Sequence, residues 1–182
     1  NNNGYFYGCA NLVLNAIDKL KANNMTTFRS GFRECSDLTA ISAGLFDNNP
    51  AITNFNACFS DCSLTAIPAG LFDNNILVTD FGYCFNKNYL LTAIPSGLFD
   101  YNTVIIDIDG CFSDCSDLTA IPAGLFDNNT LVTDFRFCFY NGSALTGSAP
   151  ELWLRDPEPT GTQCFYNATG LDNYGDIPGD WK

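Results

Sequence analysis

Residues 55–73 read Phe-Asn-Ala-Cys-Phe-Ser-Asp-Cys-Ser-Leu-Thr-Ala-Ile-Pro-Ala-Gly-Leu-Phe-Asp, and parts of this segment recur along the whole chain. Gly-Leu-Phe-Asp occurs at 44–47, 70–73, 97–100 and 124–127, and Leu-Thr-Ala-Ile occurs at 38–41, 64–67, 91–94 and 118–121. A phenylalanine column keeps the same spacing at Phe6, Phe32, Phe59, Phe85, Phe112, Phe139 and Phe165. Because a fixed period of 26–27 residues marks stacked structural units, we predict a solenoid of about six to seven repeats.

Each repeat reads as two short elements. Phe-x-x-Cys-Phe-x-x-Cys at 55–62 places apolar groups at i, i+3, i+4 and i+7, which favours a helix of about two turns. Thr79-Asp80 and Thr133-Asp134 precede such segments and suit a helix N-terminus. Leu-Thr-Ala-Ile-Pro-Ala has the spacing of the strand in leucine-rich repeats. The expected fold class is therefore an α/β solenoid, with one short parallel strand and one short helix in each 26–27-residue repeat.

The two ends of the chain differ from the regular repeats. We expect residues 1–146 to form the leucine-rich-repeat-like solenoid, with an N-terminal end that is truncated and attached to a larger chain or assembly before Asn1. Residues 147–182 are expected to hold the last repeat and the C-terminal cap of the same domain. Trp181 is the expected lid over the last core layer.

Composition excludes several classes of function. The chain has 182 residues, 8 Lys+Arg against 20 Asp+Glu, and no histidine. A net charge of −12 disfavours nucleic-acid binding, and no apolar run is long enough for membrane insertion. Without histidine, a nucleophile motif or a phosphate loop, we expect no catalytic residues, no cofactor and no metal site, and hence no enzyme.

Nine cysteines are the most conspicuous candidates for chemistry. Five precede a column phenylalanine (Cys58, Cys84, Cys111, Cys138, Cys164) and four follow one turn later (Cys9, Cys35, Cys62, Cys115). The helical pattern points both sets inward, which predicts a ladder of buried thiols. A disulfide framework is the alternative, but the odd count and the poor geometry of an i, i+4 bridge disfavour it. The Cys-x-x-x-Cys pairs lie too far apart for one zinc site.

An aspartate column at Asp47, Asp73, Asp100 and Asp127 admits two interpretations. Stacked carboxylates are suitable ligands for calcium. The neighbouring Asn-Asn residues favour an Asx-turn at each corner instead. We expect the turn, and so no metal.

Surface variation gives the clearest indication of function. The outward positions of the expected strands are small and repetitive (Ala40, Ala66, Ala93, Ala120), whereas those of the expected helices vary. Exposed aromatic and arginine side chains that fall there are candidate binding residues: Tyr83, Arg136, Phe137, Tyr140 and Tyr166. Such groups are frequent at interface hot spots, although drift at unconstrained positions would also produce them.

The repeat resembles the BspA-like leucine-rich repeats, especially the mycoplasma-lipoprotein-type units found in bacterial surface and phage tail proteins. Its matching positions are Val78, Thr79, Phe85 and Leu91, and again Val132, Thr133, Phe139 and Leu145. Phenylalanine replaces the methionine of those units. The resemblance implies an extracellular recognition or adhesion module of a bacterial surface protein or phage tail fibre, which binds a host protein or glycan. A purely structural component of a surface layer or virion appendage is the alternative.

Overall fold

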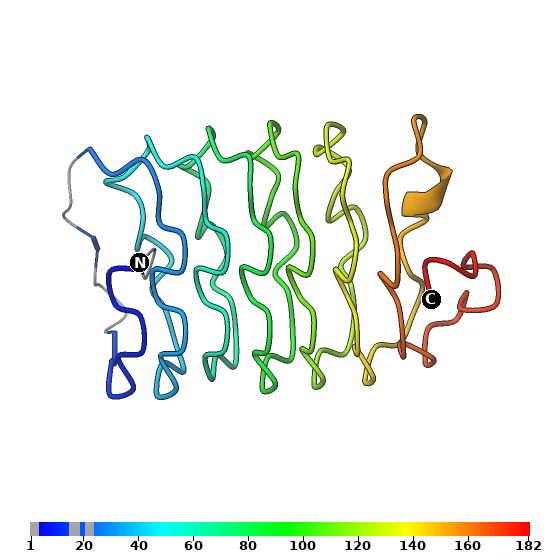
Figure 1. Cartoon of the computed structure of the whole chain (residues 1–182), viewed down its shortest axis with the longest axis horizontal. Helices are drawn as coiled ribbons and strands as arrows, with labels where there is room; N and C mark the ends of the chain where they lie inside the picture. The colour runs from blue at the N-terminus through cyan, green and yellow to red at the C-terminus, as the bar shows by residue number, and fades with distance from the viewer. Residues whose placement is uncertain (1–3, 15–18, 21–23) are drawn as a thin grey trace.

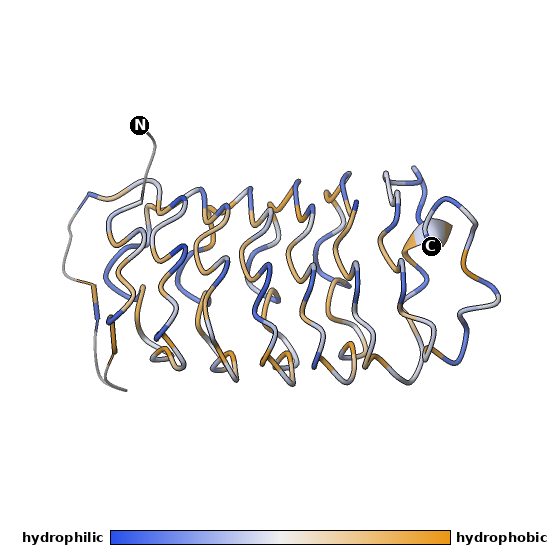
Figure 2. Cartoon of the chain, turned by 60° about the horizontal axis from the view of Figure 1, so that its bottom comes forward, coloured by the Kyte–Doolittle hydropathy of each residue, from blue (hydrophilic) through white to orange (hydrophobic). Residues whose placement is uncertain are grey.

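The computed structural model describes residues 4–14, 19–20 and 24–182. The chain winds into coils that stack along one axis, with the first and last coils at opposite ends (Figure 1). Hydrophobic stretches recur at corresponding places in successive coils (Figure 2). The predicted solenoid is thus confirmed, and the expected attachment before Asn1 concerns residues outside the described range.

Helix and strand are nearly absent from the described residues. In the part of the chain that the structure describes, the single helical element is the 3₁₀-helix η1, Leu152–Leu154. The β-type pairing among the described residues is limited to four isolated parallel bridges, which join Asn54, Asp80, Asp107, Asp134 and Thr160 in series. The expected helix and strand of each repeat are therefore wrong in detail.

Two successive β-turns replace the expected helix. In the coil that begins at Ile108, Cys111 N donates to Ile108 O and Cys115 N to Phe112 O, at 3.1 and 3.3 Å. Gly110 and Asp114, the third residues of these turns, have positive φ values of 59°, as in type II turns. Every second N–H donates instead to the following coil, as Phe112 N does to Cys138 O at 2.9 Å. Paired turns also point i, i+3, i+4 and i+7 to one side, so the apolar pattern alone did not distinguish them from a helix.

The Leu-Thr-Ala-Ile segment does not form the expected strand. Its threonines make one backbone hydrogen bond per step between coils, such as Thr92 N to Thr65 O at 3.4 Å. The parallel bridges lie instead just before the paired turns. Leu64 and Ile67 are buried as expected, but Ala69 is exposed, so the third position of the strand pattern does not face the core.

Phenylalanine rings fill the core in columns. Successive rings of the column from Phe6 to Phe165 stack with centroids 5.1–5.7 Å apart and planes within 11° of each other. A second column comprises Phe46, Phe72, Phe99 and Phe126, with centroid separations of 6.0–6.4 Å. Offset stacking adds to the hydrophobic gain from burying these rings.

All nine cysteines are free thiols, and eight of them are buried. Thiols of the second set satisfy backbone carbonyls of the preceding coil: Cys62 Sγ donates to Phe32 O at 3.1 Å, and Cys115 Sγ to Phe85 O at 3.3 Å. Asn88 replaces the cysteine in one coil, and its Nδ2 donates to Phe59 O at 2.8 Å. Cys9 departs from the predicted ladder because it is exposed in the first described segment.

At the C-terminal end, Trp181 extends the ring column. Its indole is 1% exposed and stacks on Phe165 at 6.4 Å and 21°. Backbone bonds from Phe165 N to Trp181 O and from Gln163 N to Asp180 O hold this segment as though it were another coil. A Cβ on Gly161 would overlap the indole, so the absence of a side chain there makes room for it.

Candidate functional site

The five candidate binding residues fall into two neighbouring groups on the outer surface of the paired turns. Phe137, Tyr140 and Tyr166 form an aromatic group, which we call the aromatic patch. Tyr83 and Arg136 lie instead beside a row of aspartate carboxylates. Arg136 therefore pairs with Asp134 and Asp109, whereas Phe137 and Tyr140 contact each other.

Ring contacts hold the aromatic patch together. Tyr140 stacks on Tyr166 of the next coil, with centroids 4.9 Å apart and planes at 13°. Phe137 packs edge-on against Tyr140 at 5.8 Å and 74°. Tyr166 is 43% exposed, whereas Phe137 and Tyr140 are half-buried, so Phe137 is less exposed than expected. Because stacked rings largely cover each other's faces, the patch presents mainly ring edges and hydroxyl groups.

Tyr83 lies over the backbone of the next coil. A Cβ on Gly110 would overlap the Tyr83 ring, so glycine at this position permits the contact. Burial, followed by the charge of Asp109 and a hydrogen bond to it, raises the pKa of Tyr83 to about 12. Tyr83 is therefore a neutral, partly buried group, which is less available to a partner than the sequence indicated.

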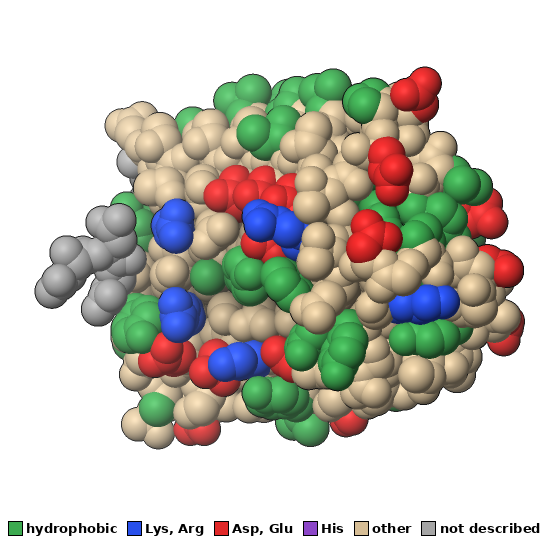
Figure 3. Space-filling model, turned by 45° about the vertical axis from the view of Figure 1, so that its right-hand side comes forward, with side chains coloured by type: hydrophobic (Ala, Val, Ile, Leu, Met, Phe, Trp, Pro, Cys, Tyr) green, Lys and Arg blue, Asp and Glu red, His purple; other side chains and the backbone are tan. Residues whose placement is uncertain are grey.

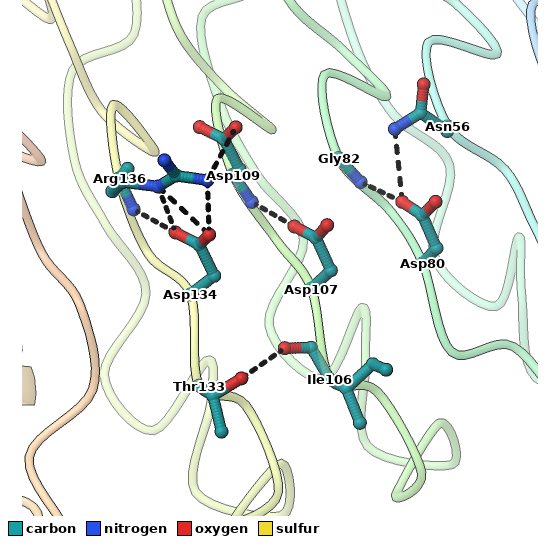
Figure 4. Close-up of polar contacts among 9 residues, drawn as sticks. All are labelled: Asn56, Asp80, Gly82, Ile106, Asp107, Asp109, Thr133, Asp134 and Arg136. Carbon is teal, nitrogen blue, oxygen red and sulfur yellow. Dashed lines mark hydrogen bonds and ion pairs between the residues drawn. The ribbon is translucent and has the colours of Figure 1, made fainter.

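Asp80, Asp107 and Asp134, which form the parallel bridges, and the neighbouring Asp109 make up a row of carboxylates, which we call the carboxylate row (Figure 4). Asp80, Asp107 and Asp134 each accept a hydrogen bond from the backbone N–H two residues later, at 2.8–3.0 Å. These Asx-turns start the paired turns. Asp80 and Asp134, which we expected to cap the N-terminus of a helix, thus cap the first of the paired turns instead.

Arg136 neutralises one end of this row. Its Nη2 lies 2.6 Å from Asp134 Oδ2 and 3.8 Å from Asp109 Oδ2, and its Nε contacts both Asp134 oxygens at 3.0 Å (Figure 4). The pKa of Arg136 is raised, first by the hydrogen bond to Asp134 and then by that carboxylate's charge. The guanidinium is pre-oriented by these contacts and is not a free positive charge, although the side chain as a whole is 45% exposed.

In the middle of the row the carboxylates repel one another, and Arg136 offsets only part of this repulsion. Burial raises the pKa of Asp107, and the charges of Asp80 and Asp134 add to this effect. Burial also raises the pKa of Asp109, with a further contribution from Asp134. Within the described residues, no group of three or more Cys, Asp or Glu side chains is placed to hold a metal ion.

The expected Asx-turns of the other aspartate column are not formed as predicted. Asp47 Oδ1 accepts from Asn74 Nδ2 at 3.0 Å, and Asp100 Oδ1 accepts from Asn128 Nδ2 at 3.3 Å. These carboxylates therefore link neighbouring coils rather than closing their own turns. A hydrogen bond from Lys19 is the main cause of the lowered pKa of Asp47.

Sequence reasoning missed the acidic partners of Arg136. Asp134 lies two residues before it, and Asp109 occupies the same turn position one repeat earlier. Aligning the repeats at the column phenylalanine would have placed all three side chains together.

The described residues also contain no helix long and apolar enough to cross a bilayer.

The chain matches no known protein-family model and no curated protein sequence. Solved leucine-rich-repeat structures are similar to it at low identity. The functional domain of InlJ from Listeria monocytogenes, which includes a cysteine ladder, is 17% identical over 79% of this chain, with a TM-score of 0.46. The leucine-rich repeat domain of APL1B is 18% identical over 79%, with a TM-score of 0.44.

The Toll–Spatzle complex of Drosophila also contains a similar chain, 19% identical over 82% of this one, with a TM-score of 0.45. The matched region is only part of each of these larger proteins. It covers 31% of the InlJ chain, 36% of the APL1B chain and 22% of the chain from the Toll complex.

Proposed function

We propose that this chain is a non-enzymatic extracellular recognition or adhesion module of the BspA-like type, which binds a protein or glycan on a cell surface. The observation that carries the proposal is the aromatic patch. Its three rings contact one another across two coils and remain partly exposed, whereas most phenylalanine rings of the chain are buried. Aromatic anchors held in place before binding lose little conformational entropy when a partner docks.

Arg136 supplies the polar edge of the proposed site. Arg136 directly precedes Phe137 in the sequence, and its salt bridge to Asp134 fixes the orientation of its guanidinium. Nearly half of the Arg136 side chain stays in contact with solvent. Remaining N–H groups are then available to a carbonyl or hydroxyl of the partner. A bacterial surface protein or a phage tail fibre is the proposed setting. Buried free thiols are easiest to preserve in a protein that folds inside a bacterium, which favours the phage part.

The repeats provide variants that test this proposal without disturbing the fold. Phe137 occupies the turn position that Ala57 holds in another coil, and Tyr140 the position of Ser60 and Ser113. The double variant Phe137→Ala, Tyr140→Ser therefore introduces residues that these turns already accept. Tyr89→Ser with Tyr101→Ser removes two other exposed tyrosines and is the matched control.

The wild type and both double variants are screened on a glycan array and on a display library of extracellular protein domains. We expect saturable binding to a restricted set of targets, loss of that binding in the patch variant, and retention in the control. Equal binding by all three proteins would refute the role of the patch. Thermal unfolding of each variant verifies that the fold is intact.

A purely structural part of a surface layer or virion appendage is the second candidate. The exposed alanine row (Ala40, Ala66, Ala93, Ala120) supports it, because small repeated side chains allow a flat surface to approach closely. Ordered fibres or sheets in electron micrographs, together with no binding on either screen, would favour this role over recognition.

A further inference from the structure

A cavity of about 500 Å³ lies where the repeat pattern breaks, between the corner of the coil at 127–133 and the irregular segment 155–159. Small-ligand and peptide sites commonly have volumes of a few hundred Å³. Leu131 and Val132 line one wall, and Pro157 and Pro159 line the other. None of these residues belongs to the aromatic patch or the carboxylate row.

Arg155, which lines the cavity, stands where regular coils carry a buried asparagine. In regular coils a buried asparagine donates to the preceding coil, as Asn129 Nδ2 does to Phe99 O and Asn102 O. In the next coil the Arg155 guanidinium provides these donors in place of asparagine. It donates to Asn129 O at 3.0 Å and to Phe126 O at 2.7 Å. It also lies over the Phe135 ring at 5.1 Å. This side chain is longer than asparagine, and the segment that carries it does not repeat the Asp-Asn-Asn corner.

The rim of the cavity is acidic. Three carboxylates line it (Asp127, Asp156 and Glu158) against the single guanidinium of Arg155, whose donors are partly used by the two backbone carbonyls. Asp47 and Asp100 each accept a hydrogen bond from an asparagine of the next coil. After Asp127, the next coil carries Leu154 and Arg155 at the corresponding positions instead of asparagines. On the face drawn in Figure 3, acidic side chains border hydrophobic ones toward the C-terminal end.

An apolar stripe leads into the cavity. Leu131 is 54% exposed, and Leu77, at the same position two coils earlier, is 51% exposed. Val104 lies between them and is half-buried. An elongated apolar surface that ends in a cavity fits an extended chain better than a compact small molecule.

We infer that this cavity binds a peptide segment of a partner protein that carries an aliphatic or aromatic side chain next to lysine or arginine. The apolar side chain enters between Leu131 and Pro159, and the basic group remains at the rim beside the carboxylates. Charge complementarity selects the occupant, since an acidic peptide would be repelled both by the rim and by the chain's net charge of −12.

Three fluorescein-labelled peptides test the inference by fluorescence polarisation with the full chain. Their sequences are Lys-Leu-Phe-Lys, Glu-Leu-Phe-Glu and Lys-Ser-Ser-Lys, each with blocked ends and a Gly-Gly spacer to the dye. We expect only the first to bind below millimolar concentration, with affinity that falls as salt is raised. Equal binding by all three, or no binding by the first, would overturn the proposal.

Matched variants locate the site. Leu131→Ala places there the residue that Ala51 supplies in another coil, and we expect about fivefold weaker binding. Leu90→Ala, at a similarly exposed leucine that belongs neither to this stripe nor to the cavity lining, is the control and should leave the affinity within about twofold. Neutralising the rim with Asp127→Asn, Asp156→Asn and Glu158→Gln should weaken the basic peptide about tenfold.

An independent readout comes from the two tryptophans. Trp181 Nε1 lies 3.4 Å from Glu158 Oε1, so occupation of the cavity should change its fluorescence. Peptide binding that leaves tryptophan emission unchanged and is insensitive to Leu131→Ala would place the peptide elsewhere and refute the site.

Discussion

Raising the pH should destabilise this protein through its buried thiols. Burial raises the pKa of eight cysteines above its ordinary value: Cys35, Cys58, Cys62, Cys84, Cys111, Cys115, Cys138 and Cys164. For Cys62 and Cys115 the pKa rises to about 12. An unfolded thiol has a pKa of about 8.5. Between these values only the unfolded chain loses protons, so stability is complete below about pH 8.5 and falls as the pH rises.

The magnitude follows from proton linkage. At pH 10 each thiol that remains protonated in the folded state favours unfolding by about 2 kcal/mol. Cys62 and Cys115, whose pKa is raised to about 12, together give about 4 kcal/mol, a large part of the roughly 5–15 kcal/mol stability of an ordinary domain. We therefore expect the free energy of unfolding to fall by at least about this amount between pH 8.5 and pH 10 at 25 °C, because the other buried thiols shift it in the same direction.

Urea unfolding, followed by circular dichroism under argon with reductant at several pH values, measures the slope of stability against pH. Each buried thiol should contribute about 1.3 kcal/mol per pH unit near pH 10. Cys115→Ala, which copies Ala168 at the same position in another coil, should lower the slope by one such increment. The cost of the lost packing does not depend on pH and leaves the slope unchanged. A stability that is flat from pH 8.5 to pH 10 would refute buried free thiols.

Three further predictions concern individual contacts. A maleimide should label one thiol, Cys9, in the native protein and all nine after denaturation; fewer than nine would indicate disulfides. Arg155→Met should lower the free energy of unfolding, measured by urea titration, by about 3 kcal/mol, because two buried carbonyls lose a charged donor. Arg33→Met, which removes an exposed ion pair, is the control and should cost less than about 1 kcal/mol. Asn88→Ala should cost about 2 kcal/mol, because the Phe59 carbonyl loses its donor and the Leu64 N–H loses its acceptor. Asn88→Cys should cost about half as much, because a thiol restores the donor; equal costs would contradict the role of the thiol as a donor.

Much of the architecture was predictable because the repeat is visible as columns in register. Phe59, Phe85 and Phe112 share a position in the sequence pattern, and they stack in the core at the spacing of successive coils. Stacking requires only that equivalent residues recur at a constant interval. The burial of cysteines in successive coils followed from the same argument, and only Cys9 in the first described segment escaped it.

Local backbone conformation was not predictable from that pattern. A helix and two consecutive turns both point every third and fourth side chain inward, and the choice depends on where the N–H groups find acceptors. In this chain Gly110 N donates to Arg136 O of the next coil at 2.8 Å, a bond that a helix could not make. Left-handed residues such as Asp61 and Asp114 were the available signal, since aspartate accepts this conformation more readily than most residues.

The candidate sites differ in predictability for a related reason. In a regular coil most polar groups are already used by the neighbouring coils, as Asp47 is by Asn74 and Asn102 by the carbonyls of the coil before it. A site for a partner therefore needs an outward side chain of unusual type or an interruption of the repeat. Sequence comparison between repeats found the first kind, at Phe137 and Tyr140, because a departure at one position is visible in an alignment. The second kind depends on how the Arg155 segment folds across the preceding coil. Nothing in the spacing of its prolines indicates that a long guanidinium reaches the carbonyls and holds a cavity open beside them.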